Sequence, residues 1–126
     1  MDAITITALK KKKWAVLGAT SRKEKFGYKI YTHLKQHGYT VYAVNPNVTE
    51  IDGDVCYPSL HALPEVPEVV DFVVPENIGV MALQDCKALG IHTVWLQPGA
   101  DRPKVVEKAK ELGLEVIQSC VLVDVK

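Results

Sequence analysis

The sequence predicts an α/β fold, a three-layer arrangement in which helices cover both faces of a doubly wound parallel five-stranded sheet. Five short aliphatic and β-branched runs recur along the 126 residues, and they are continuously apolar, as strands buried on both faces are. Stretches with apolar residues every three or four positions predict three helices. A glycine ends each of these helices just before the next strand, which is typical of repeated helix and strand units.

The elements follow from these patterns in chain order, and residues 1–12 form an N-terminal extension ahead of them. The predicted strands are Trp14 to Leu17, Thr40 to Val44, Asp71 to Val74, Thr93 to Leu96 and Leu114 to Ile117. The helical periods are Phe26, Ile30, Leu34, His37; Ile78, Met81, Asp85, Leu89; and Val105, Val106, Ala109, Leu112. The glycines that end the helices are Gly38, Gly90 and Gly113.

The connection between the second and third strands differs from the others. Asn45 to Glu68 contains four prolines and Gly53, and only Ser59 to Leu63 has the pattern of a short helix. We therefore predict a crossover that is mostly loop. Right-handed crossovers and short connections then favour the strand order 3-2-1-4-5, with a flavodoxin-type order as the alternative.

Length, charge and cysteine usage narrow the function classes. A chain of 126 residues is predicted to be a single domain, 1–126. Basic and acidic residues number 15 each, so no nucleic acid and no membrane surface is expected as a partner. No apolar run approaches the roughly 18 residues that cross a bilayer, and no signal peptide is recognised. The cysteines, Cys56, Cys86 and Cys120, have neither disulfide-framework nor zinc-finger spacing, so a cytoplasmic protein is expected.

The loop after the first strand predicts an anion site. Gly18 permits a tight turn, and backbone amides, hydroxyls and the positive end of the following helix can all face a phosphate. Three cationic side chains occur within four consecutive positions of this loop. The predicted binding residues are Gly18, Ala19, Thr20, Ser21, Arg22, Lys23 and Lys25. The alternative is a helix capping box made by Ser21 and Glu24.

The other strand-end loops add weaker signals. The second strand ends at Asn45-Pro46 without the acid that holds an NAD ribose, and no G-x-G-x-x-G motif precedes it, which disfavours classical NAD-dependent redox chemistry. Val74-Pro75 forms a stiff turn against which a flat adenine or a pantetheine arm could lie, and Gln97 adds an amide. Neither the histidines nor the serines have metal or nucleophile spacing, so no catalytic residue and no metal site is predicted.

Taken together, these loops resemble a known group over about Trp14 to Cys120. The stretches are Gly18-Ala19-Thr20-Ser21 with Lys25-Phe26-Gly27-Tyr28; Gly38-Tyr39-Thr40-Val41 with Val44-Asn45-Pro46; Ile51-Asp52-Gly53 through Tyr57-Pro58-Ser59-Leu60; and Trp95-Leu96-Gln97-Pro98-Gly99. They resemble the small CoA-binding protein family. That family is similar to the N-terminal CoA-binding domain of the succinyl-CoA synthetase alpha subunit and of the ADP-forming acyl-CoA synthetases.

The resemblance implies a Rossmann-like fold that binds coenzyme A or acyl-CoA. It implies a pyrophosphate on the loop Gly18 to Arg22, the nucleotide end near Asn45-Pro46 and the Pro75 turn, and Gln97 on the pantetheine side. The sequence departs from the family at Val74-Pro75-Glu76, where a charged contact is missing. The synthetases carry a phosphorylated histidine in a following domain that this sequence does not reach, so ligase activity is not expected to transfer with the fold.

Three hypotheses follow. The first is a stand-alone cytoplasmic module that binds CoA or acyl-CoA as a small-molecule nucleotide ligand, without covalent chemistry of its own. The alternative is a nucleotide-using enzyme subunit, of NAD(P) or acyl-CoA type, that needs a partner enzyme chain; a homo-oligomer is compatible with either. The third is a regulatory or redox role in which Cys120, after the last strand, forms a mixed disulfide with CoA.

Overall fold

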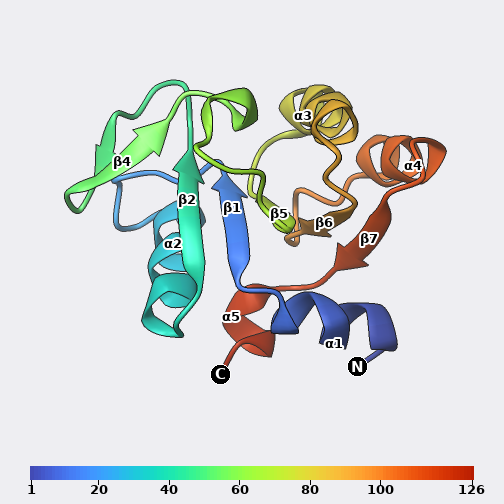
Figure 1. The fold of residues 1–126 in the computed structure, drawn as a ribbon, viewed down its shortest axis with the longest axis horizontal. Coiled ribbons are helices and arrows are strands. Elements are labelled where there is room, and N and C mark those ends of the chain that lie inside the picture. The colour runs from blue at the N-terminus through green and yellow to red at the C-terminus, as the bar shows by residue number, and fades with distance from the viewer.

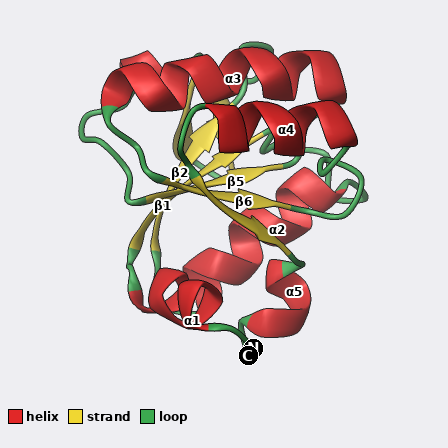
Figure 2. Cartoon of the chain, turned by 90° about the vertical axis from the view of Figure 1, so that its right-hand side faces the viewer, coloured by secondary structure: helices red, strands yellow, loops and turns green.

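Helices cover both faces of one sheet in a computed structural model that describes residues 1–126 (Figure 1). Two helices, α3 and α4, lie on one face, and α1, α2 and α5 lie on the other (Figure 2). This confirms the three-layer α/β prediction. The helices are α1 Ala3–Lys10, α2 Phe26–Gln36, α3 Glu76–Leu89, α4 Pro103–Glu111 and α5 Val121–Asp124, with a 3₁₀ turn η1 at Leu60–Ala62. No helix is long and apolar enough to span a membrane.

The sheet has seven strands in the order β3-β4-β2-β1-β5-β6-β7. Their bounds are β1 Lys13–Leu17, β2 Thr40–Val44, β3 Glu50–Ile51, β4 Asp54–Tyr57, β5 Val69–Phe72, β6 Thr93–Leu96 and β7 Glu115–Gln118. All pairs are parallel except β3 with β4. The predicted five-stranded sheet in the order 3-2-1-4-5 is therefore wrong. The predicted third strand is β5, and it pairs with β1, not with β2: Leu17 has Val44 on one side and Phe72 on the other.

A β-hairpin inside the long crossover explains this difference. Asp52 has φ 50° and Gly53 has φ 86°, and these two residues join β3 to β4. Asp-Gly is a strong signal for a two-residue hairpin turn because both positions require positive φ. The prolines of the crossover, which predicted a loop, lie outside the hairpin. Strand β4 pairs with β2 at the edge where the prediction had placed the third strand.

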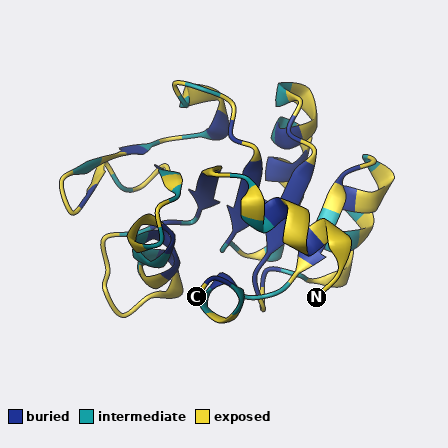
Figure 3. Ribbon diagram, turned by 60° about the horizontal axis from the view of Figure 1, so that its bottom comes forward, coloured by how far each residue is buried: buried dark blue, intermediate teal, exposed yellow.

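Two apolar clusters, one on each face of the sheet, form the core. Phe72 and Leu83 belong to the cluster beneath α3 and α4, and Trp14 and Trp95 to the cluster beneath α2 and α5. Figure 3 shows the central strands buried while the outer faces of the helices are exposed. Burial on both faces explains why the strand segments are continuously apolar and could be found from the sequence.

The N-terminal extension is also ordered. Asp2 accepts a hydrogen bond from the Thr5 amide at 2.8 Å and so caps α1. Tyr39, which precedes β2, donates its hydroxyl to the Leu9 carbonyl at 2.6 Å. The extension is thus attached at the amino end of the strands, away from the loops in which ligands of such sheets bind.

Candidate functional site

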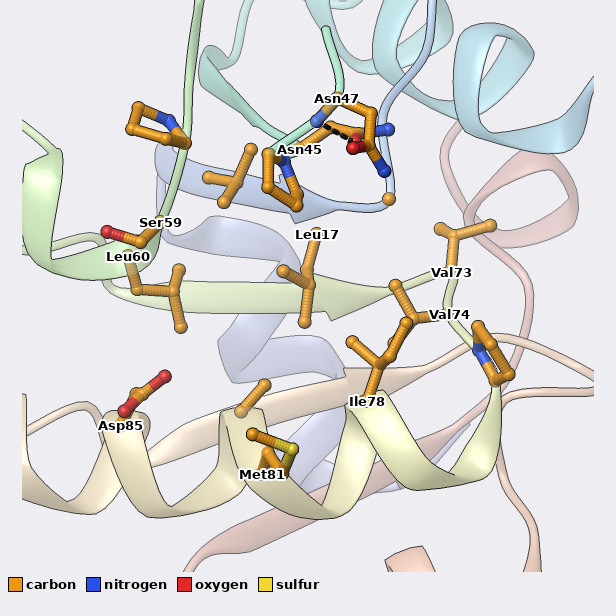
Figure 4. Close-up of a pocket in the computed structure, with 16 residues that line it drawn as sticks. Leu17, Asn45, Asn47, Ser59, Leu60, Val73, Val74, Ile78, Met81 and Asp85 are labelled. Atoms are coloured by element: carbon orange, nitrogen blue, oxygen red, sulfur yellow. Dashed lines mark hydrogen bonds between the residues drawn. The ribbon is translucent and has the colours of Figure 1, made fainter.

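The largest cavity lies at the carboxyl ends of β1, β2 and β5 and has a volume of about 520 Å³ (Figure 4). We call it the main cavity. Its walls are mostly apolar, with a few amide, hydroxyl and carboxylate groups. The lining residues are Leu17, Gly18, Val44, Asn45, Pro46, Asn47, Pro58, Ser59, Leu60, Val73, Val74, Pro75, Ile78, Met81, Ala82 and Asp85.

Two smaller cavities adjoin the main cavity. The cationic cavity, about 400 Å³, is lined by Gly18, Thr20, Arg22, Lys25, Phe26, Gly27 and Val73. The Cys120 cavity, about 160 Å³, is lined by Phe26, Ile30, Val73, Gln97, Pro98 and Cys120. Gly18 and Val73 line both the main and the cationic cavity, and Phe26 and Val73 line both the cationic and the Cys120 cavity. The three therefore adjoin one another along the carboxyl edge of the sheet.

Gly18 makes the turn between the first two cavities possible. Its amide donates to the Val44 carbonyl at 2.9 Å, and its φ is 98°. A Cβ at this position would lie 2.2 Å from the Val73 carbonyl oxygen. Only glycine tolerates both this φ and this close approach, so the tight turn predicted for Gly18 is present.

The loop after Gly18 is longer than a capping box allows. Helix α2 begins only at Phe26, with Lys25 at its N-cap, so the Ser21 and Glu24 capping box is wrong. The Glu24 carboxylate instead pairs with Arg22 Nε at 3.2 Å. Its pKa is lowered, first by a hydrogen bond from its own backbone amide and then by the Arg22 charge. Glu24 thus offsets part of the positive charge that the sequence places here.

The predicted anion-binding residues separate into two groups. Gly18, Thr20, Arg22 and Lys25 line the cationic cavity. Ala19 is fully buried, whereas Ser21 and Lys23 are exposed and line none of the three cavities. Lys25 lines the cavity from the N-cap position of α2.

Asn45 connects two of the strand-end loops. Its Nδ2 donates to the Ala19 carbonyl at 2.9 Å, and its Oδ1 accepts from the Asn47 amide at 2.9 Å. Both ends of the side chain are therefore engaged by protein. Asn45 and Pro46 line the main cavity as predicted, and Figure 4 shows Asn47 beside Asn45.

Residues of α3 and of the crossover complete the main cavity, and sequence reasoning missed them. Ile78 and Met81 are 45% and 71% exposed, unusual values for large apolar residues at a cavity. Asp85 accepts a hydrogen bond from His61 Nε2 at 3.2 Å, and Ser59 lies across the cavity from α3 (Figure 4). The period of Ile78, Met81 and Asp85 correctly predicted a helix, but this face lines the cavity rather than the core.

The third and fourth strand ends form the remaining wall. Val74 and Pro75 line the main cavity where β5 leads into α3. Gln97 is buried, and its Oε1 accepts from the Val121 amide at 3.1 Å. Gln97 therefore faces the Cys120 cavity and also fixes the backbone that carries Cys120.

An open parallel sheet with an apolar cavity beside a cationic one, joined at a tight glycine turn, defines a nucleotide-binding α/β domain. The chain belongs to the family described as the CoA binding domain, whose sequence profile matches residues 12–126. The resemblance drawn from the loop motifs is thereby confirmed.

The known relatives include much longer enzymes. The chain is 33% identical over 113 residues to acetate–CoA ligase (ADP-forming) I of Archaeoglobus fulgidus, covering 82% of this chain and 16% of that protein. It is 28% identical over 119 residues to the alpha subunit of ADP-forming acetate–CoA ligase II of Pyrococcus furiosus, covering 85% and 26%. The chain thus spans only about a sixth to a quarter of the length of these curated relatives.

Solved structures of similar size match nearly the whole fold. A hypothetical protein from Pyrococcus horikoshii OT3 superposes with a TM-score of 0.85 at 32% identity, covering 93% of this chain and 82% of that one. A conserved hypothetical protein from Pyrococcus furiosus gives a TM-score of 0.83 at 33% identity, covering 90% and 98%. Chains of about this length therefore exist in this fold.

Proposed function

We propose that this chain is a cytoplasmic module that binds coenzyme A or acyl-CoA along the three adjoining cavities. The observation that carries the proposal is the sharing of Gly18 and Val73 between the main and cationic cavities. A nucleotide in the first cavity would place its phosphates directly in the second. Membership of the CoA binding domain family supports the choice of ligand, and three free cysteines fit a reducing compartment.

The main cavity fits the adenosine end. Its volume of about 520 Å³ lies within the range of small-molecule sites, and its walls combine apolar surface with a few polar groups. Pro46 and Pro75 offer flat, rigid surfaces, and Ile78 and Met81 leave apolar area exposed that an adenine ring would cover. Burial of that area would supply much of the affinity.

The cationic cavity fits the pyrophosphate. Arg22 and Lys25 provide charge, Thr20 provides a hydroxyl, and the amino end of α2 adds the positive end of its dipole. The pantetheine arm would then pass Phe26 and Val73 into the Cys120 cavity, where Gln97 lies. This arrangement uses Gly18, Thr20, Arg22, Lys25, Asn45, Pro46, Val74, Pro75 and Gln97 of the residues predicted from the sequence.

A second candidate function is a part in a larger acyl-CoA-forming enzyme. The observation that favours it is the length of the relatives, which include an acetate–CoA ligase alpha subunit. This candidate predicts acyl-CoA formation when the tagged chain is purified together with a partner chain. The binding module predicts CoA affinity without such a partner.

Isothermal titration calorimetry of the isolated chain tests the proposal. CoA, acetyl-CoA, NAD and ATP are titrated separately in a buffer with a phosphine reductant. We expect saturable heat with CoA and acetyl-CoA and a much weaker response with NAD, because the second strand ends in Asn45 and not in an acid. Saturation by NAD with no response to CoA would overturn the assignment.

A further inference from the structure

The main cavity has two chemically different ends. Val73, which also lines the cationic cavity, lies at one end, and Ser59 and Asp85 lie at the other (Figure 4). A nucleotide whose phosphates occupy the cationic cavity would therefore enter past Val73 and direct its base toward Ser59 and Asp85. The groups at that far end are the ones that can distinguish one base from another.

One face of α3 forms the wall that runs between these two ends. Ile78, Met81 and Asp85 line the cavity at intervals of three and four residues, which places them in a row on this face. From Ile78 to Asp85 the helix rises about 10 Å, because each residue adds roughly 1.5 Å. A nucleoside spans a comparable length, so a base that lies over Ile78 and Met81 would bring its far edge to Asp85.

Asp85 is the only charged residue among those that line the main cavity. Its Oδ1 accepts a hydrogen bond from His61 Nε2 at 3.2 Å, and its other oxygen, Oδ2, has no hydrogen bond within the chain. Leu60 of η1 and Ala82 of α3 belong to the same apolar cluster, so the turn that carries His61 is packed against the helix. The carboxylate is thus held at the cavity wall with one oxygen free to accept from a ligand.

The uncharged polar side chains of the cavity differ in what they offer a ligand. Both ends of the Asn45 side chain are already engaged by protein. Ser59 is the N-cap residue of η1, but its hydroxyl caps no backbone amide. This hydroxyl can therefore donate to a ring nitrogen of a ligand or accept from it. Asp85 and Ser59, from opposite walls, provide an acceptor and a hydroxyl at the same end of the cavity.

We infer that Asp85 selects the base of the bound nucleotide by accepting a hydrogen bond from the 6-amino group of adenine, and that His61 is a positioning residue for its carboxylate. The inference rests on the proposed function, because a nucleotide must first occupy the main and cationic cavities. An ionised carboxylate only accepts hydrogen bonds. It favours a ring with an amine at position 6 and repels a ring with a carbonyl oxygen there, as in hypoxanthine.

The exposure of Asp85 sets the size of the expected selectivity. A site that hydrogen-bonds one group of a ligand rejects an analogue without that group, because its own polar atoms are left unpaired. The Asp85 side chain is 44% exposed, so water partly replaces the lost contact. We therefore expect selectivity of about tenfold, well below that of a fully enclosed site.

Calorimetry with CoA and with deamino-CoA, in which hypoxanthine replaces adenine, tests the inference. The two ligands share their phosphates and pantetheine arm and differ only at the 6-position and the neighbouring N1 of the ring. Under a phosphine reductant, the wild type should bind CoA about tenfold more tightly than deamino-CoA. Equal affinities, or tighter binding of deamino-CoA, would overturn this inference alone. No binding of CoA would overturn the proposed function as well.

Asp85→Asn separates selection of the base from a general effect of charge. A carboxamide can turn its oxygen toward the amine of CoA or its nitrogen toward the carbonyl of deamino-CoA, so the two affinities should become nearly equal. Glu76→Gln is the matched control, because it removes the same charge from α3 at a residue that lines none of the three cavities. It should keep the wild-type ratio of affinities. A wild-type ratio in Asp85→Asn would exclude Asp85 as the residue that selects the base.

A second pair of variants tests the positioning role of His61. His61→Ala frees the Asp85 carboxylate and should lower the ratio of the two affinities. His61→Gln keeps a side-chain N–H donor and should restore the ratio. Thermal unfolding without ligand checks that each variant is folded. An unchanged ratio in His61→Ala, or no recovery in His61→Gln, would exclude this role.

Discussion

Gly27, in the first turn of α2, is packed directly against Gly18: a Cβ on Gly27 would lie 2.1 Å from the Gly18 carbonyl oxygen. The helix can approach the end of β1 this closely only because position 27 has no side chain. The contact places the amino end of α2 at the cationic cavity, where its dipole faces the proposed pyrophosphate. Two glycines nine residues apart thus perform the packing that other dinucleotide sites achieve with a shorter glycine motif.

Replacing Gly27 with alanine should therefore damage both stability and binding. The added methyl group meets backbone atoms that cannot rotate away, and overpacking of this kind costs about 1–3 kcal/mol. The shift of α2 should also weaken CoA binding. Urea unfolding and calorimetry measure the two effects.

Gly38→Ala is the matched control. Gly38 has φ 86° with open space around it, so a Cβ there costs roughly 1–2 kcal/mol of backbone strain without a clash. It lies at the opposite end of α2, and CoA affinity should stay unchanged. Equal affinity losses in the two variants would contradict the role of the Gly18 and Gly27 contact.

The double substitution Arg22→Ala with Lys25→Ala should lower CoA affinity by about a hundredfold, because charge-assisted hydrogen bonds to phosphate contribute roughly 1.5 kcal/mol each and about 1.4 kcal/mol is a factor of ten. The dependence of affinity on salt should also become shallower. Lys23→Ala is the control, since Lys23 is exposed and lines none of the three cavities. Titration of CoA into each variant at two salt concentrations measures these effects. If Lys23→Ala lowered CoA affinity as much as the double substitution, the net charge of the loop and not contact with the phosphates would explain the loss.

Asn45→Asp should destabilise the chain by about 1–2 kcal/mol. Asn45 Nδ2 donates to the Ala19 carbonyl, and a carboxylate cannot replace that donor. The variant places an acid at the end of the second strand, yet we expect no gain of NAD affinity, because the side chain points into the loop contact. Asn47→Asp adds the same charge two residues away and should cost less than about 0.5 kcal/mol. A similar loss of melting temperature in both variants would argue against the Asn45 connection.

Asp71 should make the fold less stable as pH rises. Its carboxyl is fully buried in β5, and burial raises its folded pKa well above the ordinary value of 3.8, so between these two values the folded chain retains a proton that the unfolded chain has lost. Stability is then full below about pH 4 and falls by up to about 1.4 kcal/mol per pH unit until the folded pKa is passed. Asp71→Asn removes this loss. Urea unfolding of both proteins from pH 5 to 8 should show a widening difference in favour of the variant, and parallel curves would contradict the prediction.

Patterns of burial made most of the fold predictable from sequence. The five predicted strands are all present, and burial explains this best for the central strands β1, β5 and β6, whose residues are almost all buried. Gly38, Gly90 and Gly113 all have positive φ where the helices end. The Asp52-Gly53 hairpin was missed because prolines on either side of it outweighed a turn signal only two residues long. Because the hairpin was missed, the predicted sheet lacked β3 and β4, and the predicted strand order was wrong.

The site was less predictable because it depends on where loops meet. Gly18 could be assigned from its own residue type, and Asn45 and Pro75 from their places at strand ends. Ile78 and Met81 have the spacing of core residues, and only the tertiary fold shows that their face of α3 borders a cavity. Asp71 lies within an apolar strand and gives no sequence signal that distinguishes a buried acid from an exposed one.

A titration followed by nitrogen–proton NMR tests most directly whether CoA binds at the carboxyl edge of the sheet. The glycine amides provide probes at both edges: Gly18 and Gly27 lie at the proposed site, and Gly38, Gly90 and Gly113 lie where helices end at the opposite edge. With CoA added under reducing conditions, we predict large shifts for Gly18 and Gly27 and unchanged signals for the other three. Shifts confined to the opposite edge, or no shift at saturating CoA, would contradict the account.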